Sequence, residues 1–96
     1  MLAIANRGII FAPGSAGTVQ EIFMEATQNH YGVFQLVSPM VFFGTDYWQA
    51  TLPALPLLRQ LATNRQYAQL IATFDDPHAI VAYLLTTAPI VYTPTA

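Results

Sequence analysis

Apolar residues occur along this chain in two patterns, compact runs and helically spaced positions. Three short apolar runs are bounded by glycine, proline or polar turns, which is typical of strands buried in a sheet. These runs cover residues 4–12, 39–43 and 69–73. Three other segments repeat apolar residues every three or four positions, which predicts helices with one buried face. These helices are expected over residues 19–31, over residues 52–61 and from Pro77 through Leu85.

The predicted elements alternate in the order βαβαβα, which is typical of an α/β fold with a parallel sheet of about three strands. Residues 88–96 are expected to be irregular. Ligands of such sheets bind beyond the carboxyl ends of the strands. Three polar turns are expected together at that edge of the sheet. They cover residues 14–18, 44–47 and 73–76.

Length and composition restrict the class of protein. The 96 residues suffice for one domain or part of one, and an apolar content of 54% excludes a disordered tail. Only 8% of the residues are charged, which is low for the surface of a small monomer. We therefore expect apolar surface to be covered, either in a homo-oligomer or by a missing N-terminal half of the domain.

Missing residue types exclude several chemistries. The formal charge is −2 and no basic run is present, so nucleic-acid binding is not expected. The absence of cysteine excludes disulfides, a thiolate nucleophile and cysteine-ligated zinc, and no metal site is expected. The absence of lysine excludes both a P-loop lysine and a pyridoxal Schiff base, so no cofactor is expected.

The C-terminal charge-free stretch, residues 77–96, is interrupted by three prolines and does not predict a membrane span. The N-terminus lacks the charged segment and apolar stretch of a secretory signal. A cytoplasmic location without membrane partners is therefore expected.

The segment 13–21 joins the first predicted strand to the first predicted helix. Gly14 and Gly17 let a ligand approach the backbone closely, and the helix start adds a partial positive charge of about half a unit. These features favour the binding of a phosphate group. Thr18 can add a hydroxyl donor, and Glu21 can accept from a sugar hydroxyl or take part in acid–base chemistry.

A purely structural interpretation of the same segment stays open. Thr18 and Glu21 have the T-x-x-E spacing of a capping box, in which two side chains satisfy the first free N–H groups of a helix. For Thr18, capping and phosphate binding are compatible. For Glu21 they compete, because a carboxylate folded back onto the helix start is less free to meet substrate.

Residues 13–21 resemble a known family motif. They are similar to the P-G-G-x-G-T-x-x-E signature of the LONELY GUY phosphoribohydrolases and their lysine-decarboxylase-like relatives, with Ser15 in place of the second glycine. The order of the later elements is similar to the C-terminal half of this family's Rossmann-like fold. The resemblance covers nearly the whole chain and implies one partial, three-layer Rossmann-like nucleotide-binding domain over residues 1–96.

The resemblance implies hydrolysis of the N-glycosidic bond of a nucleoside 5′-monophosphate, giving free base and ribose 5-phosphate. The phosphate would be held by five consecutive residues through their backbone N–H groups and the hydroxyl of the last one. These residues are Gly14, Ser15, Ala16, Gly17 and Thr18. Glu21 matches the family's functional glutamate and would position the ribose or the attacking water.

The chain departs from the family pattern upstream of the motif. Family members carry a catalytic arginine in an M-x-x-R-K stretch, preceded by a first strand and a glycine-rich turn, and neither precedes Met1. Arg7 lies too close to Pro13 to take that role. We therefore expect the C-terminal half of such a domain. Three functions stay open: a phosphoribohydrolase, a non-catalytic nucleotide- or phosphate-binding module, and a structural fragment that completes an oligomer.

Two glutamates and a histidine of the first helix have both a site interpretation and a structural one. Glu21 and Glu25 can form a carboxylate pair, or can be solvated acids that complement the helix dipole. His30 can be a ligand or a base, or a residue that the dipole favours at a helix end.

The two later turns carry further candidates. Asp46 and Tyr47 can contact ribose or base, although Asp46 can equally cap a helix. Asp75 and Asp76 are expected mainly to cap the last helix. Tyr47 and Trp48 are the aromatic residues placed to stack on a base.

Overall fold

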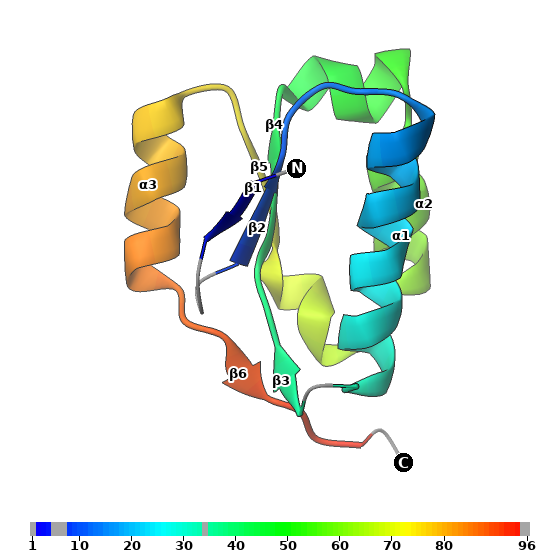
Figure 1. The fold of residues 1–96 in the computed structure, drawn as a ribbon, viewed down its shortest axis with the longest axis vertical. Helices are drawn as coiled ribbons and strands as arrows, with labels where there is room; N and C mark the ends of the chain where they lie inside the picture. The colour runs from blue at the N-terminus through cyan, green and yellow to red at the C-terminus, as the bar shows by residue number, and fades with distance from the viewer. Residues whose placement is uncertain (1, 5–7, 34, 95–96) are drawn as a thin grey trace.

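The computed structural model describes residues 2–4, 8–33 and 35–94 and has a four-stranded sheet in the order β1-β2-β4-β5 (Figure 1). The four strands are β1 (Leu2–Ile4), β2 (Gly8–Phe11), β4 (Met40–Phe43) and β5 (Ile71–Phe74). Strands β2, β4 and β5 are parallel, and β1 pairs antiparallel with β2. The predicted α/β fold with three parallel strands is confirmed.

Helices cover both faces of the sheet and give three layers (Figure 1). Helices α1 (Ala16–Tyr31) and α2 (Ala54–Leu61) lie on one face, and α3 (Pro77–Thr86) lies on the other. Two short helical turns, η1 (Tyr47–Thr51) and η2 (Gln66–Leu70), precede α2 and β5. Each of the three predicted helices is present, with α1 beginning three residues earlier than the apolar spacing indicates. None of the described helices is both long and apolar enough to cross a membrane.

The first predicted strand is wrong in its extent. Ile4 belongs to β1, which runs antiparallel to β2, and residues 5–7 lie outside the described part. Gly8 begins β2 with φ 148°, and a Cβ there would stand 2.7 Å from the carbonyl oxygen of Pro39. A glycine is needed at this position because the chain before β4 passes directly against it.

The prediction of an irregular C-terminal segment is also wrong in part. Residues Ile90–Val91 form β6, which pairs antiparallel with β3 (Leu36–Val37) in a second small sheet. Helix α1 ends, as expected, at Gly32, whose φ of 63° closes the helix with a bond from its N–H to the carbonyl of Gln28. The ring of Tyr92 packs against Gly32, so any side chain there would displace the segment that follows β6.

Most of the buried apolar volume lies between the sheet and the α1–α2 layer. Phe11 and Phe42 stack there with ring centroids 5.2 Å apart, and Trp48 packs edge-on against Phe42. A smaller cluster under α3 is formed by Val41, Ile80 and Leu84. The larger core therefore fixes α1, and with it the turn that precedes α1, against the ends of β2 and β4.

Candidate functional site

The turn between β2 and α1 lies at the edge where the three parallel strands end (top of Figure 1). Ser15 is the N-cap residue of α1, and its carbonyl oxygen accepts the first helical bond from the N–H of Val19 at 2.9 Å. The side chain of Ser15 makes no capping bond. The sequence therefore ends a strand and begins a helix here without using a side chain to satisfy the helix start.

Three backbone donors are left free by this arrangement. In the described part of the chain, the N–H groups of Ala16, Gly17 and Thr18 have no hydrogen-bond partner. They point out of the first turn of a 16-residue helix, where the helix dipole is equivalent to about half a positive charge. An anion that accepts from these donors would satisfy what the chain itself leaves open.

The capping-box interpretation of Thr18 and Glu21 is wrong. Ser15, not Thr18, occupies the N-cap, so Thr18 is the third residue of the helix. The hydroxyl of Thr18 lies against Gly14 instead: a Cβ on Gly14 would stand 2.1 Å from Thr18 Oγ1. Gly14 is thus required by the Thr18 side chain, whereas a Cβ on Gly17 would meet nothing within 4 Å.

A cavity of about 590 Å³ opens beside the turn. Its walls come from the start of α1 and from the segment after β4, and they are largely apolar. The lining residues are Ser15, Ala16, Val19, Gln20, Tyr47 and Leu52. The hydroxyl of Tyr47 donates to the carbonyl oxygen of Gly14. This bond fixes the ring beside the turn formed by residues 14–18, here called the glycine turn. The structure thus brings Tyr47 and the Gly14–Thr18 segment together.

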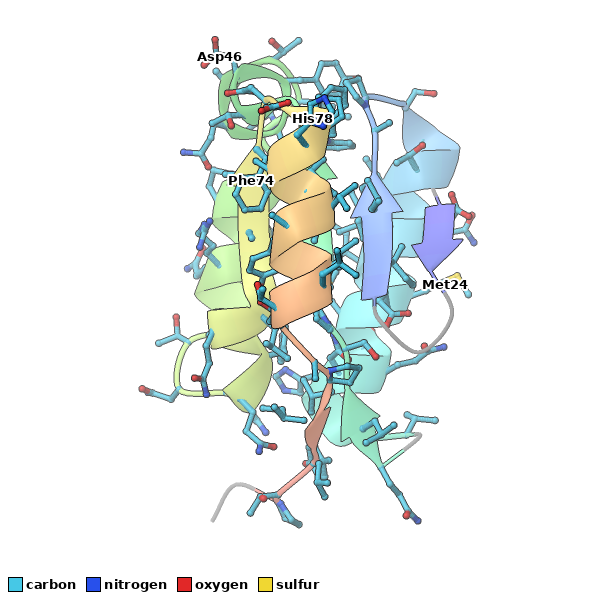
Figure 2. The ribbon with its side chains drawn as sticks, turned by 90° about the vertical axis from the view of Figure 1, so that its left-hand side faces the viewer. Met24, Asp46, Phe74 and His78 are labelled. Atoms are coloured by element: carbon cyan, nitrogen blue, oxygen red, sulfur yellow. The ribbon has the colours of Figure 1, made fainter. Side chains whose placement is uncertain are left out.

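Asp46 and Trp48, the neighbours of Tyr47, do not line this cavity. Asp46 is exposed at the start of η1 and makes no capping hydrogen bond, so its capping role is not present (Figure 2). Trp48 is fully buried, and its indole N–H donates to the carbonyls of Phe11 at 3.2 Å and Phe43 at 3.1 Å. Trp48 is therefore a core residue, and the idea that it stacks on a base is wrong.

Glu21 lies outside the cavity beside the glycine turn. It lines a separate, smaller cavity of about 170 Å³ together with Ile9, Met24, Glu25 and Gln28. The two glutamates thus line the same cavity, and their role as a carboxylate pair stays a prediction. Burial raises the pKa of Glu25 above its ordinary value.

The third turn of this edge is held together by its own polar groups. Asp75 accepts from the backbone N–H of Thr45 at 2.7 Å, and the hydroxyls of Thr45 and Thr73 lie 3.0 Å apart. Asp76 caps α3 by accepting from the N–H of His78 at 3.0 Å, which confirms its predicted role. Asp75 therefore connects the second and third turns and does not cap α3 as predicted, whereas Asp76 does.

His30 lies at the opposite end of α1, where Nδ1 is 3.1 Å from the hydroxyl of Tyr67. Sequence reasoning missed this contact, and it also missed the bond between Tyr47 and Gly14. No signal in the sequence links residues 37 positions apart. Within the described ranges, no group of three or more acidic or histidine side chains could hold a metal ion.

Comparison with known proteins leaves the family resemblance of residues 13–21 as a prediction. No protein-family model, no curated protein and no solved structure matches the chain. The class that the fold and the site define is therefore an α/β chain with a three-stranded parallel sheet and an open helix start at the carboxyl ends of its strands.

Proposed function

We propose that this chain binds a nucleoside 5′-monophosphate, with the phosphate at the turn formed by residues 14–18. The observation that carries the proposal is the row of free N–H groups on Ala16, Gly17 and Thr18, next to a cavity of about 590 Å³. Charge-assisted bonds from backbone donors to a phosphate are stronger than neutral ones, and the helix dipole adds to them.

The cavity beside the turn suits the rest of such a ligand. Its volume lies in the range of small-molecule sites, and its walls include the apolar side chains of Val19 and Leu52. The ring of Tyr47 is fixed by its bond to Gly14 and offers an aromatic edge and face near the phosphate donors. A base or ribose would gain apolar contact there without a long polar recognition network.

Hydrolysis of the N-glycosidic bond is the reaction that the family resemblance implies, with Glu21 as the acting carboxylate. Glu21 and Glu25 line the neighbouring cavity along α1, so this reaction needs the ribose to extend from the turn toward Glu21. Glu25, whose pKa burial raises above its ordinary value, is the second carboxyl of that cavity and could assist Glu21 in acid–base chemistry.

A non-catalytic nucleotide-binding module is the second candidate. It is favoured by one observation: the larger cavity at the phosphate donors is lined by Tyr47 and not by Glu21. A nucleotide whose base lies toward Tyr47 would be bound with its glycosidic bond away from the carboxylates.

Titration of AMP, GMP, CMP and UMP into the chain, each beside its nucleoside, tests binding. We expect at least one nucleotide to bind about tenfold or more tightly than its nucleoside, because only the nucleotide carries the phosphate. Equal affinity for a nucleotide and its nucleoside would contradict a phosphate site.

Release of free base, measured by chromatography, separates the two candidates. Turnover that is lost in Glu21→Gln while nucleotide affinity is kept would support the hydrolase. Binding without release, unchanged in Glu21→Gln, would support the module. Glu25→Gln is the matched variant, since it removes the second carboxyl of the same cavity one helical turn away.

A further inference from the structure

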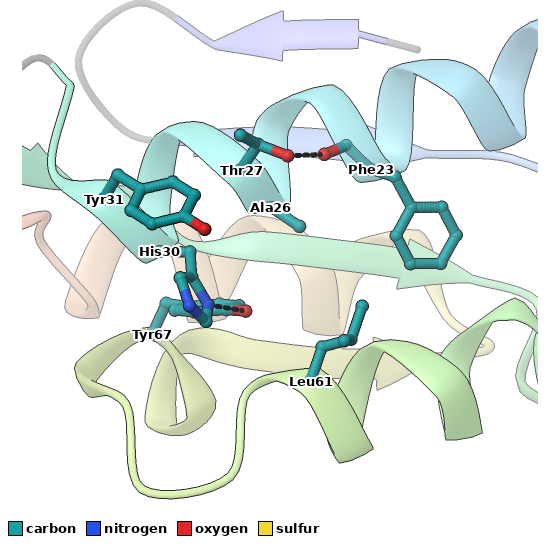
Figure 3. A pocket seen from close by; sticks show the side chains of 7 residues that line it. All are labelled: Phe23, Ala26, Thr27, His30, Tyr31, Leu61 and Tyr67. Carbon is teal, nitrogen blue, oxygen red and sulfur yellow. Dashed lines mark hydrogen bonds between the residues drawn. The ribbon is translucent and has the colours of Figure 1, made fainter.

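A second cavity, of about 320 Å³, lies at the C-terminal end of α1 (Figure 3). Side chains from α1, α2 and η2 form its walls. They are Phe23, Ala26, Thr27, His30, Tyr31, Leu61 and Tyr67. It shares no lining residue with the cavity at the glycine turn. Since α1 has 16 residues, the two helix ends are about 22 Å apart.

His30 is held in a fixed orientation in this cavity. Its ring meets Tyr31 edge-on with centroids 4.8 Å apart, and Tyr67 edge-on with centroids 5.8 Å apart. Its Nδ1 lies 3.1 Å from the hydroxyl of Tyr67 (Figure 3). A histidine between two tyrosine rings loses little further freedom when it binds a ligand.

The hydrogen bond between Tyr67 and Nδ1 of His30 identifies the other ring nitrogen, Nε2, as a donor. Tyr67 is only 1% exposed, and within the described residues His30 is the sole partner of its hydroxyl. The buried O–H of Tyr67 therefore donates to Nδ1, since otherwise its hydrogen would have no acceptor. A neutral imidazole that accepts at Nδ1 carries its hydrogen on Nε2.

The surroundings favour a neutral histidine and an incoming anion. Burial, and after it the positive charge of Arg65, lower the pKa of His30. Arg65 directly precedes η2, two positions before Tyr67, and its positive charge also acts on Tyr67. Phe23, Ala26 and Leu61 supply the apolar walls. The hydroxyl of Thr27, which also lines the cavity, already donates to the carbonyl oxygen of Phe23 at 2.7 Å.

From these observations we propose that the cavity binds a small aromatic or branched aliphatic carboxylate. The apolar body packs between Phe23, Ala26 and Leu61, and the carboxylate accepts from Nε2–H of His30. The volume, at the lower end of the range for small-molecule sites, is sufficient for a single ring with its carboxylate. This site is independent of the nucleotide proposal.

Benzoate is the probe, and benzamide is its uncharged isostere. Each is titrated into the ¹⁵N-labelled chain, and amide shifts are followed by NMR. We expect saturable benzoate shifts centred on residues 26–31, 61 and 67, and affinity for benzamide about fivefold or more weaker. Shifts centred on residues 16–18 would assign benzoate to the glycine turn and overturn the proposal, and so would the absence of saturable shifts.

Two exposed leucines of α2 give a matched pair of variants. Leu61 and Leu57 are both 49% exposed, but only Leu61 lines the cavity. Leu61→Asp should lower benzoate affinity about tenfold or more, because it places a second negative charge in the apolar wall. Leu57→Asp should bind as the parent chain does. Equal binding by both variants would overturn the proposal.

Arg65→Gln tests the charge separately from the shape. It should reduce the affinity for benzoate to about that for benzamide and leave benzamide binding unchanged. If the preference for benzoate survives Arg65→Gln, then the assigned source of anion selectivity is wrong. Circular dichroism of every variant confirms that the fold is kept.

Discussion

The two ends of helix α1 offer a ligand different kinds of group. The N-terminal end presents three backbone donors that no group in the described part of the chain pairs with, and they need no particular side chain beyond the space left by Gly14. The C-terminal end presents a side-chain pair, His30 and Tyr67, brought together from segments 37 residues apart. Donors that come from the backbone are visible in a contiguous motif, whereas a pair of side chains exists only once the chain has folded.

The helix dipole also separates the two ends. At the N-terminus it acts in the same direction as the free amides and attracts an anion. At the C-terminus it would favour a charged histidine, yet burial and Arg65 together lower the pKa of His30. The local environment therefore outweighs the dipole at one end and reinforces it at the other.

The largest effect should come from Gly14→Ala. A Cβ there would stand 2.1 Å from Thr18 Oγ1 and 2.9 Å from Thr18 Cβ, so the turn must shift. We expect the free energy of unfolding to fall by about 2 kcal/mol, measured by urea denaturation. Gly17→Ala is the control, since its Cβ meets nothing within 4 Å and alanine favours a helix by about 0.5–1 kcal/mol. Equal losses in the two variants would show that the contact with Thr18 is not what requires Gly14.

An intermediate effect is expected for the two tyrosines that carry the key hydroxyls. Tyr47→Phe removes the bond to Gly14, and Tyr67→Phe removes the bond to His30. Each should cost about 1 kcal/mol of stability. Tyr47→Phe should weaken nucleotide binding and leave benzoate binding intact, and Tyr67→Phe should do the reverse. A variant that weakened both ligands equally would mean that the two ends of α1 are coupled.

The smallest effect concerns the pH dependence contributed by His30. Because the pKa of His30 is lower in the folded chain than its ordinary value of 6.5, the unfolded chain binds the proton more readily. The contribution of His30 to the free energy of unfolding is therefore fully present above pH 6.5. It is lost as the pH falls below 6.5 and through the pKa that His30 has in the folded chain.

Melting temperatures across that pH range test this sign. His30→Gln should flatten the fall in melting temperature between pH 7.5 and pH 5. His78→Gln is the control, since His78 is exposed near the start of α3 (Figure 2). An unchanged pH profile in His30→Gln would contradict the lowered pKa.

The sequence predicts those elements whose apolar residues form a local pattern or whose ends are marked by glycine, proline or a polar turn. The parallel strands at residues 40–43 and 71–74 are apolar runs closed by turns, and α1 ends at a left-handed glycine. Strands β1, β3 and β6, of two or three residues, are too short to carry a pattern and depend on their pairing partners. They are the elements that prediction missed.

The candidate site follows the same division. The five residues of the glycine turn are contiguous, so the sequence alone was enough to predict them as candidate site residues. Which face of α1 carries Glu21, and which of Tyr47 and Trp48 is buried, depends on packing against β2, β4 and η1. The sequence offers two adjacent aromatic residues and no means of choosing between them.

The side chain of Trp48 helps to fix the turn formed by residues 14–18. Trp48 joins the last carbonyls of β2 and β4 through a single N–H, and its neighbour Tyr47 holds Gly14. The loops at this end are therefore tied to the core by the same short helical turn. A ligand arriving there finds its donors already oriented, so association orders little of the chain and can proceed as a lock-and-key encounter.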